Sequence, residues 1–134
     1  MAAWLLKTEP SAYAFADLLR EGTTAWTGVK NPQARLHLKA MKVGDAVAVY
    51  HTGAEKAAVG LGAVARAAYP DPAGGAGALA VEVEAGAPLP APVPLAALKA
   101  AKAFAGSPLL TQGRLSVVPL SAAQWKALLK LGQR

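Results

Sequence analysis

The chain has 134 residues, 54% of them hydrophobic and 16% charged, which indicates one domain over residues 1–134 with a sizeable core. It contains no cysteine, so disulfide bonds, thiol nucleophiles and thiolate metal sites are excluded. The formal net charge of +6 favours a polyanionic partner, although a charge of this size identifies none.

The first part of the chain predicts a strand, a helix and a short strand end. Trp4, Leu5 and Leu6 form an apolar run within residues 3–7, which indicates a buried strand. The run ends at Glu9-Pro10, where the proline favours extended backbone at Glu9. Ser11 is a suitable N-cap for a helix to about Glu21, and residues 26–29 are expected to form a strand end and a loop.

Asn31 followed by Pro32 predicts the start of a second helix, which runs to about Met41. This helix carries a basic stripe at helical spacing, formed by Arg35, Lys39 and Lys42. A solvated surface and a phosphate-binding surface explain the stripe equally well.

The rest of the chain predicts strands at residues 46–51, 57–69, 78–84 and 115–120. Gly60 and Gly62 interrupt the second of these, as happens where a strand bends. We expect a loop over residues 70–77, a Pro-rich connector over 88–94, a helix over 94–105 and a C-terminal helix that opens with a capping box at Ser121.

These elements favour an α+β fold, in which helices pack around a mixed or antiparallel, barrel-like β-sheet. The connections between the middle strands have the length of hairpins. A doubly wound parallel sheet would need a crossover helix within residues 46–84, and none is predicted there.

The common catalytic motifs are missing from the sequence: there is no G-x-S-x-G elbow, no Walker-type phosphate loop and no H-E-x-x-H. The two histidines are not at ligand spacing. His37 within a helix is expected on the surface, and His51 at a strand end is expected to be hydrogen-bonded and structural. We therefore expect no metal, no cofactor and no catalytic residue.

Polar and aromatic residues instead gather after the predicted strand ends, where sheet scaffolds commonly hold ligands. A nucleic-acid base can be held by a flat ring, a carboxylate that accepts from an exocyclic amine, and backbone groups exposed at glycines. Trp26, Glu9 and Gly28 could supply these groups. Each of them alone also has an ordinary structural explanation, such as a core tryptophan or a surface ion pair.

Several ordered motifs resemble the EVE domain. They are Trp4-Leu5-Leu6-Lys7-Thr8-Glu9-Pro10, Trp26-Thr27-Gly28-Val29-Lys30-Asn31-Pro32-Gln33-Ala34-Arg35, Met41-Lys42-Val43-Gly44-Asp45 through Tyr50-His51, Tyr69-Pro70-Asp71, and Arg114-Leu115-Ser116-Val117-Val118-Pro119. The resemblance covers essentially the whole chain, and the family contains many stand-alone bacterial proteins.

The resemblance implies a PUA-like pseudo-barrel, related to the YTH and ASCH domains, and a non-catalytic pocket for a modified base such as a modified cytosine. In this family pattern Trp26 is the stacking wall, and the polar edge is read by Lys7, Thr8 and Glu9. The rim consists of Gly28, Val29 and Asn31, and the far side of Tyr50, His51, Arg114, Leu115 and Ser116. The residues expected to contact the nucleic-acid backbone are Lys30, Arg35, Lys39 and Lys42. Arg35 either binds phosphate or braces the loop.

Four positions depart from the pattern. Thr8 and Thr52 stand where the family often has Ser, Pro32 where an aromatic residue is frequent, and Gly113 where a polar residue is frequent. The added methyl group of Thr8 reduces the pocket volume and Pro32 removes a ring from the rim, so we expect the preferred modification to differ.

Two other functions stay open. Certain ASCH proteins cleave acylated cytidine with a Lys, Thr and Glu constellation, and Lys7, Thr8 and Glu9 supply these residue types. Consecutive strand residues point to alternate faces, so the three would converge only if the backbone twists at Pro10. A free-nucleoside sensor would use the same pocket, and its binding would depend little on salt.

The remaining expectations concern partner and location. We expect a monomer whose partner is DNA or RNA carrying a modified base. No apolar run reaches the 18 or so residues that cross a bilayer and no secretory signal is visible, so we expect no membrane contact and a cytoplasmic location.

Overall fold

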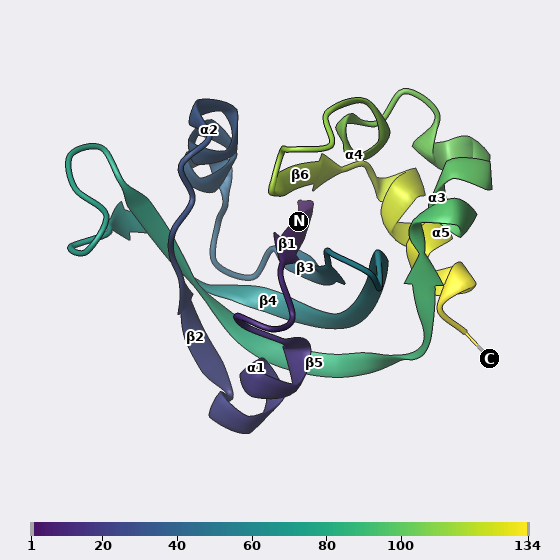
Figure 1. Cartoon of the computed structure of the whole chain (residues 1–134), viewed down its shortest axis with the longest axis horizontal. Helices are drawn as coiled ribbons and strands as arrows, with labels where there is room; N and C mark the ends of the chain where they lie inside the picture. The colour runs from purple at the N-terminus through teal and green to yellow at the C-terminus, as the bar shows by residue number, and fades with distance from the viewer. Residues whose placement is uncertain (1, 134) are drawn as a thin grey trace.

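The computed structural model describes residues 2–133, and their six strands form one sheet with the order β2-β5-β4-β3-β1-β6 (Figure 1). The strands are β1 (Ala3–Thr8), β2 (Thr23–Trp26), β3 (Ala46–His51), β4 (Ala57–Pro70), β5 (Leu79–Pro94) and β6 (Val117–Leu120). The helices are α1 (Phe15–Glu21), α2 (Pro32–Ala40), α3 (Leu95–Ala100), the 3₁₀ helix η1 (Lys102–Phe104), α4 (Pro108–Thr111) and α5 (Ala122–Leu131).

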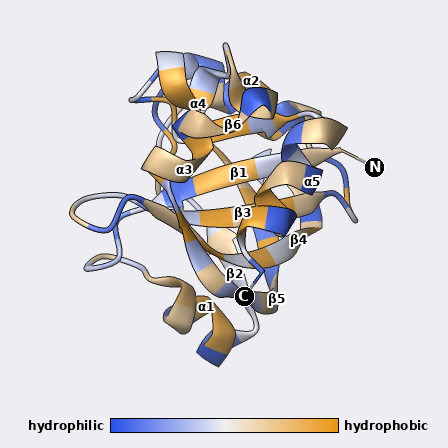
Figure 2. Ribbon diagram, turned by 90° about the vertical axis from the view of Figure 1, so that its right-hand side faces the viewer, coloured by the Kyte–Doolittle hydropathy of each residue, from blue (hydrophilic) through white to orange (hydrophobic). Residues whose placement is uncertain are grey.

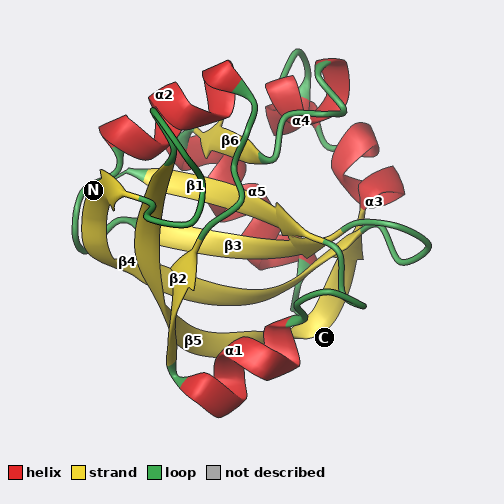
Figure 3. Ribbon diagram, turned by 60° about the vertical axis from the view of Figure 1, so that its left-hand side comes forward, coloured by secondary structure: helices red, strands yellow, loops and turns green. Residues whose placement is uncertain are grey.

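The sheet is mixed, because β1 and β3 are parallel neighbours and the other neighbouring strands are antiparallel. Thr8 at the end of β1 is therefore the register partner of His51 at the end of β3, and both strand ends open at the same edge. The expected α+β sheet with flanking helices is confirmed. The sheet is strongly curved but open, with β2 and β6 at its two edges (Figure 3).

The core lies on the central strands. Leu5 and Leu6 of β1 are fully buried, and apolar residues concentrate on β1 and β3 in the middle of the molecule (Figure 2). Helix α2 packs on β6, β5 and β4, whereas α5 packs on β5 and β6. None of the helices within residues 2–133 is long and apolar enough to cross a membrane.

The start of the chain is fastened by Asp45, which precedes β3 and is buried. Its Oδ2 accepts from the indole Nε1 of Trp4 at 3.0 Å and from the backbone N of Lys42 at 2.9 Å, and its Oδ1 accepts from the backbone N of Ala2 at 3.2 Å. One carboxylate thus joins the first strand to the turn that follows α2.

Strand β4 bends where the sequence analysis placed its interruptions. The register with β5 shifts on both sides of Gly60, between Ala58 and Gly60 and between Gly60 and Gly62. A Cβ atom on Gly60 would lie 2.2 Å from the ring of Phe15, the first residue of α1. The glycine therefore leaves the room that this ring needs. The bent strand and α1 are therefore fitted to each other.

The sequence predicted a Pro-rich connector over residues 88–94, but these residues form the second half of β5. Prolines 88, 90, 92 and 94 are exposed and alternate with other residues, of which Leu89 and Val93 are buried. This period of two is a strand pattern, which the high proline content concealed. Residues 88–94 lie beyond the stretch of β5 that pairs with β2.

Three other boundaries were also predicted wrongly. The first helix begins at Phe15 rather than after Ser11, because residues 9–13 form a turn in which Ala12 and Tyr13 donate their backbone N–H groups to the backbone O of Glu9. The helix expected over 94–105 divides into α3 and η1, separated by the extended Ala101. Strand β6 starts at Val117, two residues later than expected, whereas the capping box at Ser121 is confirmed.

Candidate functional site

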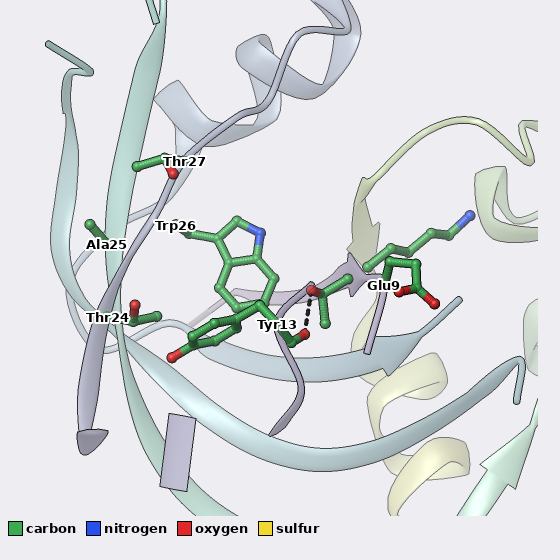
Figure 4. A pocket seen from close by; sticks show the side chains of 8 residues that line it. Glu9, Tyr13, Thr24, Ala25, Trp26 and Thr27 are labelled. Carbon is green, nitrogen blue, oxygen red and sulfur yellow. Dashed lines mark hydrogen bonds between the residues drawn. The ribbon is translucent and has the colours of Figure 1, made fainter. Parts of the chain in front are cut away.

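A pocket of about 330 Å³ opens at the C-terminal end of β1, between this strand end and β2 (Figure 4). We call it the strand-end pocket, and its lining residues are Lys7, Thr8, Glu9, Tyr13, Thr24, Ala25, Trp26 and Thr27. Its volume is that of a small-molecule site, and its walls mix hydroxyl groups with two aromatic rings.

The two rings form the apolar part of the strand-end pocket. Trp26 closes β2 and is only 7% exposed, and the ring of Tyr13 meets it edge-on at 87° with centroids 6.1 Å apart. The Tyr13 hydroxyl donates to Glu21 Oε1 at 2.6 Å, and burial together with this neighbour raises the pKa of Tyr13. The phenol is thereby anchored and stays neutral at physiological pH.

The indole nitrogen of Trp26 points away from the Tyr13 ring (Figure 4). Within residues 2–133 it has no hydrogen-bond partner. Every buried side-chain nitrogen or oxygen in that range does have one, so the Trp26 N–H is accessible to solvent. Trp26 therefore offers a hydrogen-bond donor as well as a flat ring.

Lys7 and Thr8 point in different directions. The Thr8 hydroxyl donates to the backbone O of Tyr13 at 2.7 Å, and this bond holds the Tyr13 segment against β1. The Lys7 ammonium donates to the backbone O of Gly113 at 3.1 Å and lies 5.9 Å from the centroid of the Tyr50 ring. Burial lowers the pKa of Lys7.

Glu9 is exposed at the rim of the strand-end pocket rather than at its base. Its Oε2 accepts from the backbone N of Ser11 at 2.7 Å and from the Ser11 hydroxyl. These two bonds lower the pKa of Glu9, so the carboxylate remains charged and can accept from a ligand amine.

The residues expected on the far side do not line the strand-end pocket. His51 is buried, where Nε2 accepts from the backbone N of Phe15 at 3.0 Å and Nδ1 faces Glu55 Oε1 at 2.7 Å. The expectation of a hydrogen-bonded structural histidine is confirmed. Arg114 is exposed, Leu115 is buried, and the backbone O of Ser116 accepts from the backbone N of Lys7 at 2.9 Å.

The expected rim residues organise the loop between β2 and α2. The Asn31 side chain caps α2 by accepting from the backbone N of Gln33 at 2.8 Å and of Ala34 at 3.1 Å. Arg35 Nε donates to the backbone O of Val29 at 3.0 Å, which makes Arg35 the brace of this loop. Gly28 holds a φ of +75° in the same loop.

The basic residues near α2 are accessible. Lys30, Lys39 and Lys42 are exposed. The ion pairs among residues 2–133 involve other side chains, namely Arg20–Asp17, His51–Glu55 and Arg66–Glu82. Three ammonium groups are thus left to attract an anionic polymer.

The strand-end pocket includes four residues that the sequence analysis did not select: Tyr13, Thr24, Ala25 and Thr27. The helix expected after Ser11 would include Tyr13, but Tyr13 lies in the turn before α1 and its ring packs against Trp26 of β2. The alternation along β2 could have marked Thr24 and Trp26 as sharing a face, had the strand been extended back to Thr23.

The site as built can hold a flat, partly polar ring. Its donors are the Trp26 indole N–H and the Lys7 ammonium at the margin, its acceptors are the Glu9 carboxylate and threonine hydroxyls, and its apolar surface is aromatic. No cluster of three histidine, aspartate or glutamate side chains suited to a metal occurs within residues 2–133.

An open mixed sheet with flanking helices, and a pocket beyond the end of β1, define an α+β protein of the PUA-like kind. The EVE domain pattern matches residues 2–131, so the chain belongs to the EVE domain family, as the sequence motifs indicated. A Rhodopseudomonas palustris protein solved by NMR is 41% identical, with a TM-score of 0.91 over 98% of this chain and 93% of its own.

Human THYN1, solved in complex with DNA containing 5-methylcytosine, is 29% identical, with a TM-score of 0.87 over 100% of this chain and 99% of that chain. The full human thymocyte nuclear protein 1 sequence is 36% identical over 80 residues, which cover 51% of this chain. The matched segment spans 36% of the length of that relative.

Proposed function

We propose that this chain is a non-catalytic reader that binds a flipped, modified base of a nucleic acid, with modified cytosine favoured. The observation that carries the proposal is the strand-end pocket, in which an aromatic wall lies beside hydrogen-bonding groups of both kinds. The THYN1 complex with 5-methylcytosine DNA supports this class of ligand, because THYN1 is similar over the whole chain.

The energetics of base capture suit the composition of the pocket. Extruding a base costs a few kcal/mol, and one base stacked on an aromatic ring recovers about 1–3 kcal/mol. The Trp26 N–H and the Glu9 carboxylate can add hydrogen bonds to the base edge. Lys30, Lys39 and Lys42 supply the attraction to phosphate that brings the polymer to the pocket.

The amidohydrolase alternative gains no support from the geometry. It requires Lys7, Thr8 and Glu9 to converge on one substrate carbon. Instead the Lys7 ammonium donates to Gly113, the Thr8 hydroxyl donates to Tyr13, and the Glu9 carboxylate is held by Ser11.

The test is a fluorescence-anisotropy titration with matched oligonucleotides that differ only in one central cytosine or 5-methylcytosine. Single-stranded DNA, duplex DNA and RNA versions are compared at about 50 and 200 mM salt. We expect the methylated strand to bind about tenfold more tightly, and binding of both strands to weaken with salt. Equal affinity for both strands at both salt concentrations would refute base reading.

Trp26→Ala is the informative variant, with Trp125→Ala on α5 as its matched control because Trp125 is not among the lining residues of the strand-end pocket. Trp26→Ala should abolish the preference for the methylated strand, and Trp125→Ala should preserve it. Tight binding of the free nucleoside with no oligonucleotide binding would instead support the nucleoside sensor.

A further inference from the structure

A second cavity of about 170 Å³ lies on the other side of Lys7. Its lining residues are Lys7, Tyr50, Thr52, Gly53, Lys56, Leu95, Leu109 and Gly113. Lys7 lines both cavities, and the backbone N of Thr52 donates to the backbone O of Thr8 at 2.9 Å. The two cavities therefore flank the same strand end and share Lys7.

The Lys7 ammonium belongs to the second cavity by its contacts. It donates to Gly113 and lies near the ring of Tyr50, the register partner of Lys7 on β3. No carboxylate within residues 2–133 forms an ion pair with it. A half-buried cation without a counter-ion is suited to receive an anionic group from a ligand.

Lys56 is a second lysine that lines this cavity, and its backbone conformation is unfavourable. It is the only non-glycine residue among residues 2–133 with a positive φ, which is +46°. Glycine adopts this left-handed region without the steric penalty of a side chain. The backbone O of Lys56 accepts from the backbone N of Leu95 at 2.8 Å, which helps to hold this conformation.

Two carboxylates near this cavity, those of Glu9 and Glu55, have a hydrogen-bond partner that does not line it. Glu9 is held by Ser11, and Glu55 contacts the Nδ1 atom of His51. The second cavity is also lined by the apolar Leu95 and Leu109 and by the Tyr50 ring, so it offers a surface for a sugar next to a charged group.

We propose that the second cavity binds the sugar-phosphate unit attached to the base in the strand-end pocket, with the phosphate between Lys7 and Lys56. This inference rests on the proposed function and specifies how the polymer backbone is engaged at that site. Ammonium–phosphate hydrogen bonds are charge-assisted, and they carry no sequence information. The backbone contact would thus come from the strand-end edge as well as from the lysines near α2.

The experiment compares three probes by calorimetric titration: 5-methyl-2′-deoxycytidine, its 5′-monophosphate and its 3′-monophosphate. The variant is Lys56→Gly, and Lys126→Ala on the exposed face of α5 is the control for loss of one charge. In the wild-type chain we expect one monophosphate to bind at least about tenfold more tightly than the nucleoside, the size of one charged hydrogen bond.

Lys56→Gly should reduce that gain to less than about threefold and should raise the melting temperature, because glycine relieves the positive φ. Lys126→Ala should retain the gain. Backbone amide NMR signals of Gly53 and Gly113 should shift with the favoured monophosphate and not with the nucleoside.

The outcomes separate the two proposals. If nucleoside and monophosphates bind equally, or if Lys56→Gly keeps the full gain, the second cavity is not a phosphate site while base reading stands. If no probe and no methylated oligonucleotide binds, both proposals fail.

Discussion

Replacing Asp45 by Asn should destabilise the fold more than a typical surface change, because Asp45 is a buried carboxylate with three donors. Hydrogen bonds to a charged group contribute about 1.5–3 kcal/mol each, and a buried donor left without a partner costs about 1–3 kcal/mol. Asparagine keeps one acceptor oxygen, so its Oδ1 can still serve Trp4 and Lys42, while its amide group faces the N–H of Ala2.

We therefore expect a loss of about 2 kcal/mol for Asp45→Asn, which lowers the melting temperature by about 8 °C in a chain of this length. The assay is thermal and urea unfolding followed by circular dichroism at pH 7. Asp71→Asn is the matched control, because Asp71 is also buried but within residues 2–133 its carboxylate accepts a single backbone hydrogen bond, from Ala73. A loss below about 0.5 kcal/mol, the level of an ordinary surface change, would refute the reasoning.

The same variant has a pH signature. Burial alone raises the pKa of Asp45, but the hydrogen bonds from Trp4, Lys42 and Ala2 outweigh burial and leave this pKa below its usual value. A carboxyl whose folded pKa is depressed contributes stability above its unfolded pKa of about 3.9. That contribution disappears as the pH falls through the folded pKa, so the difference in stability between wild type and Asp45→Asn should narrow below about pH 4.

Three further predictions concern the strand bend, the α2 cap and Lys7. Gly60→Ala should cost about 1–3 kcal/mol in unfolding experiments, because its Cβ would lie 2.2 Å from the Phe15 ring; a neutral effect would mean that α1 can move away. Asn31→Ala should cost about 1 kcal/mol of stability through loss of the cap, whereas Asn31→Asp should cost much less. Burial lowers the pKa of Lys7, so nucleotide affinity should fall as the pH rises toward the ordinary lysine pKa of about 10.4, and it should fall more steeply than nucleoside affinity; parallel pH profiles would exclude the Lys7 contact.

The helix starts that were predicted correctly are those in which a side chain caps backbone N–H groups only a few residues away. Asn31-Pro32 starts α2 and Ser121 caps α5, because both motifs satisfy the first N–H groups of a helix on their own. Ser11 is not the cap of α1, because Ala12 and Tyr13 donate their backbone N–H groups to the backbone O of Glu9 in a turn that comes before the helix. That turn depends on how the chain bends at Pro10, which the sequence does not specify.

The sequence predicted which segments form the candidate site, but not where their side chains point. Lys7 and Thr8 are neighbours in the motif, yet strand alternation and the parallel pairing of β1 with β3 send Lys7 towards Tyr50. Tyr13 enters the strand-end pocket only because Thr8 fixes its backbone and Trp26 receives its ring. These contacts join segments that are far apart in the sequence, so the sequence alone does not show that they are close in space.

The alternating prolines of β5 also bear on how the protein behaves at high concentration. Proline has no N–H, so the exposed positions 88, 90, 92 and 94 cannot donate to a strand added from another molecule. An exposed sheet edge otherwise invites such additions, which lead to aggregation. The outer half of β5 can therefore curve around the core without becoming a template for polymer growth.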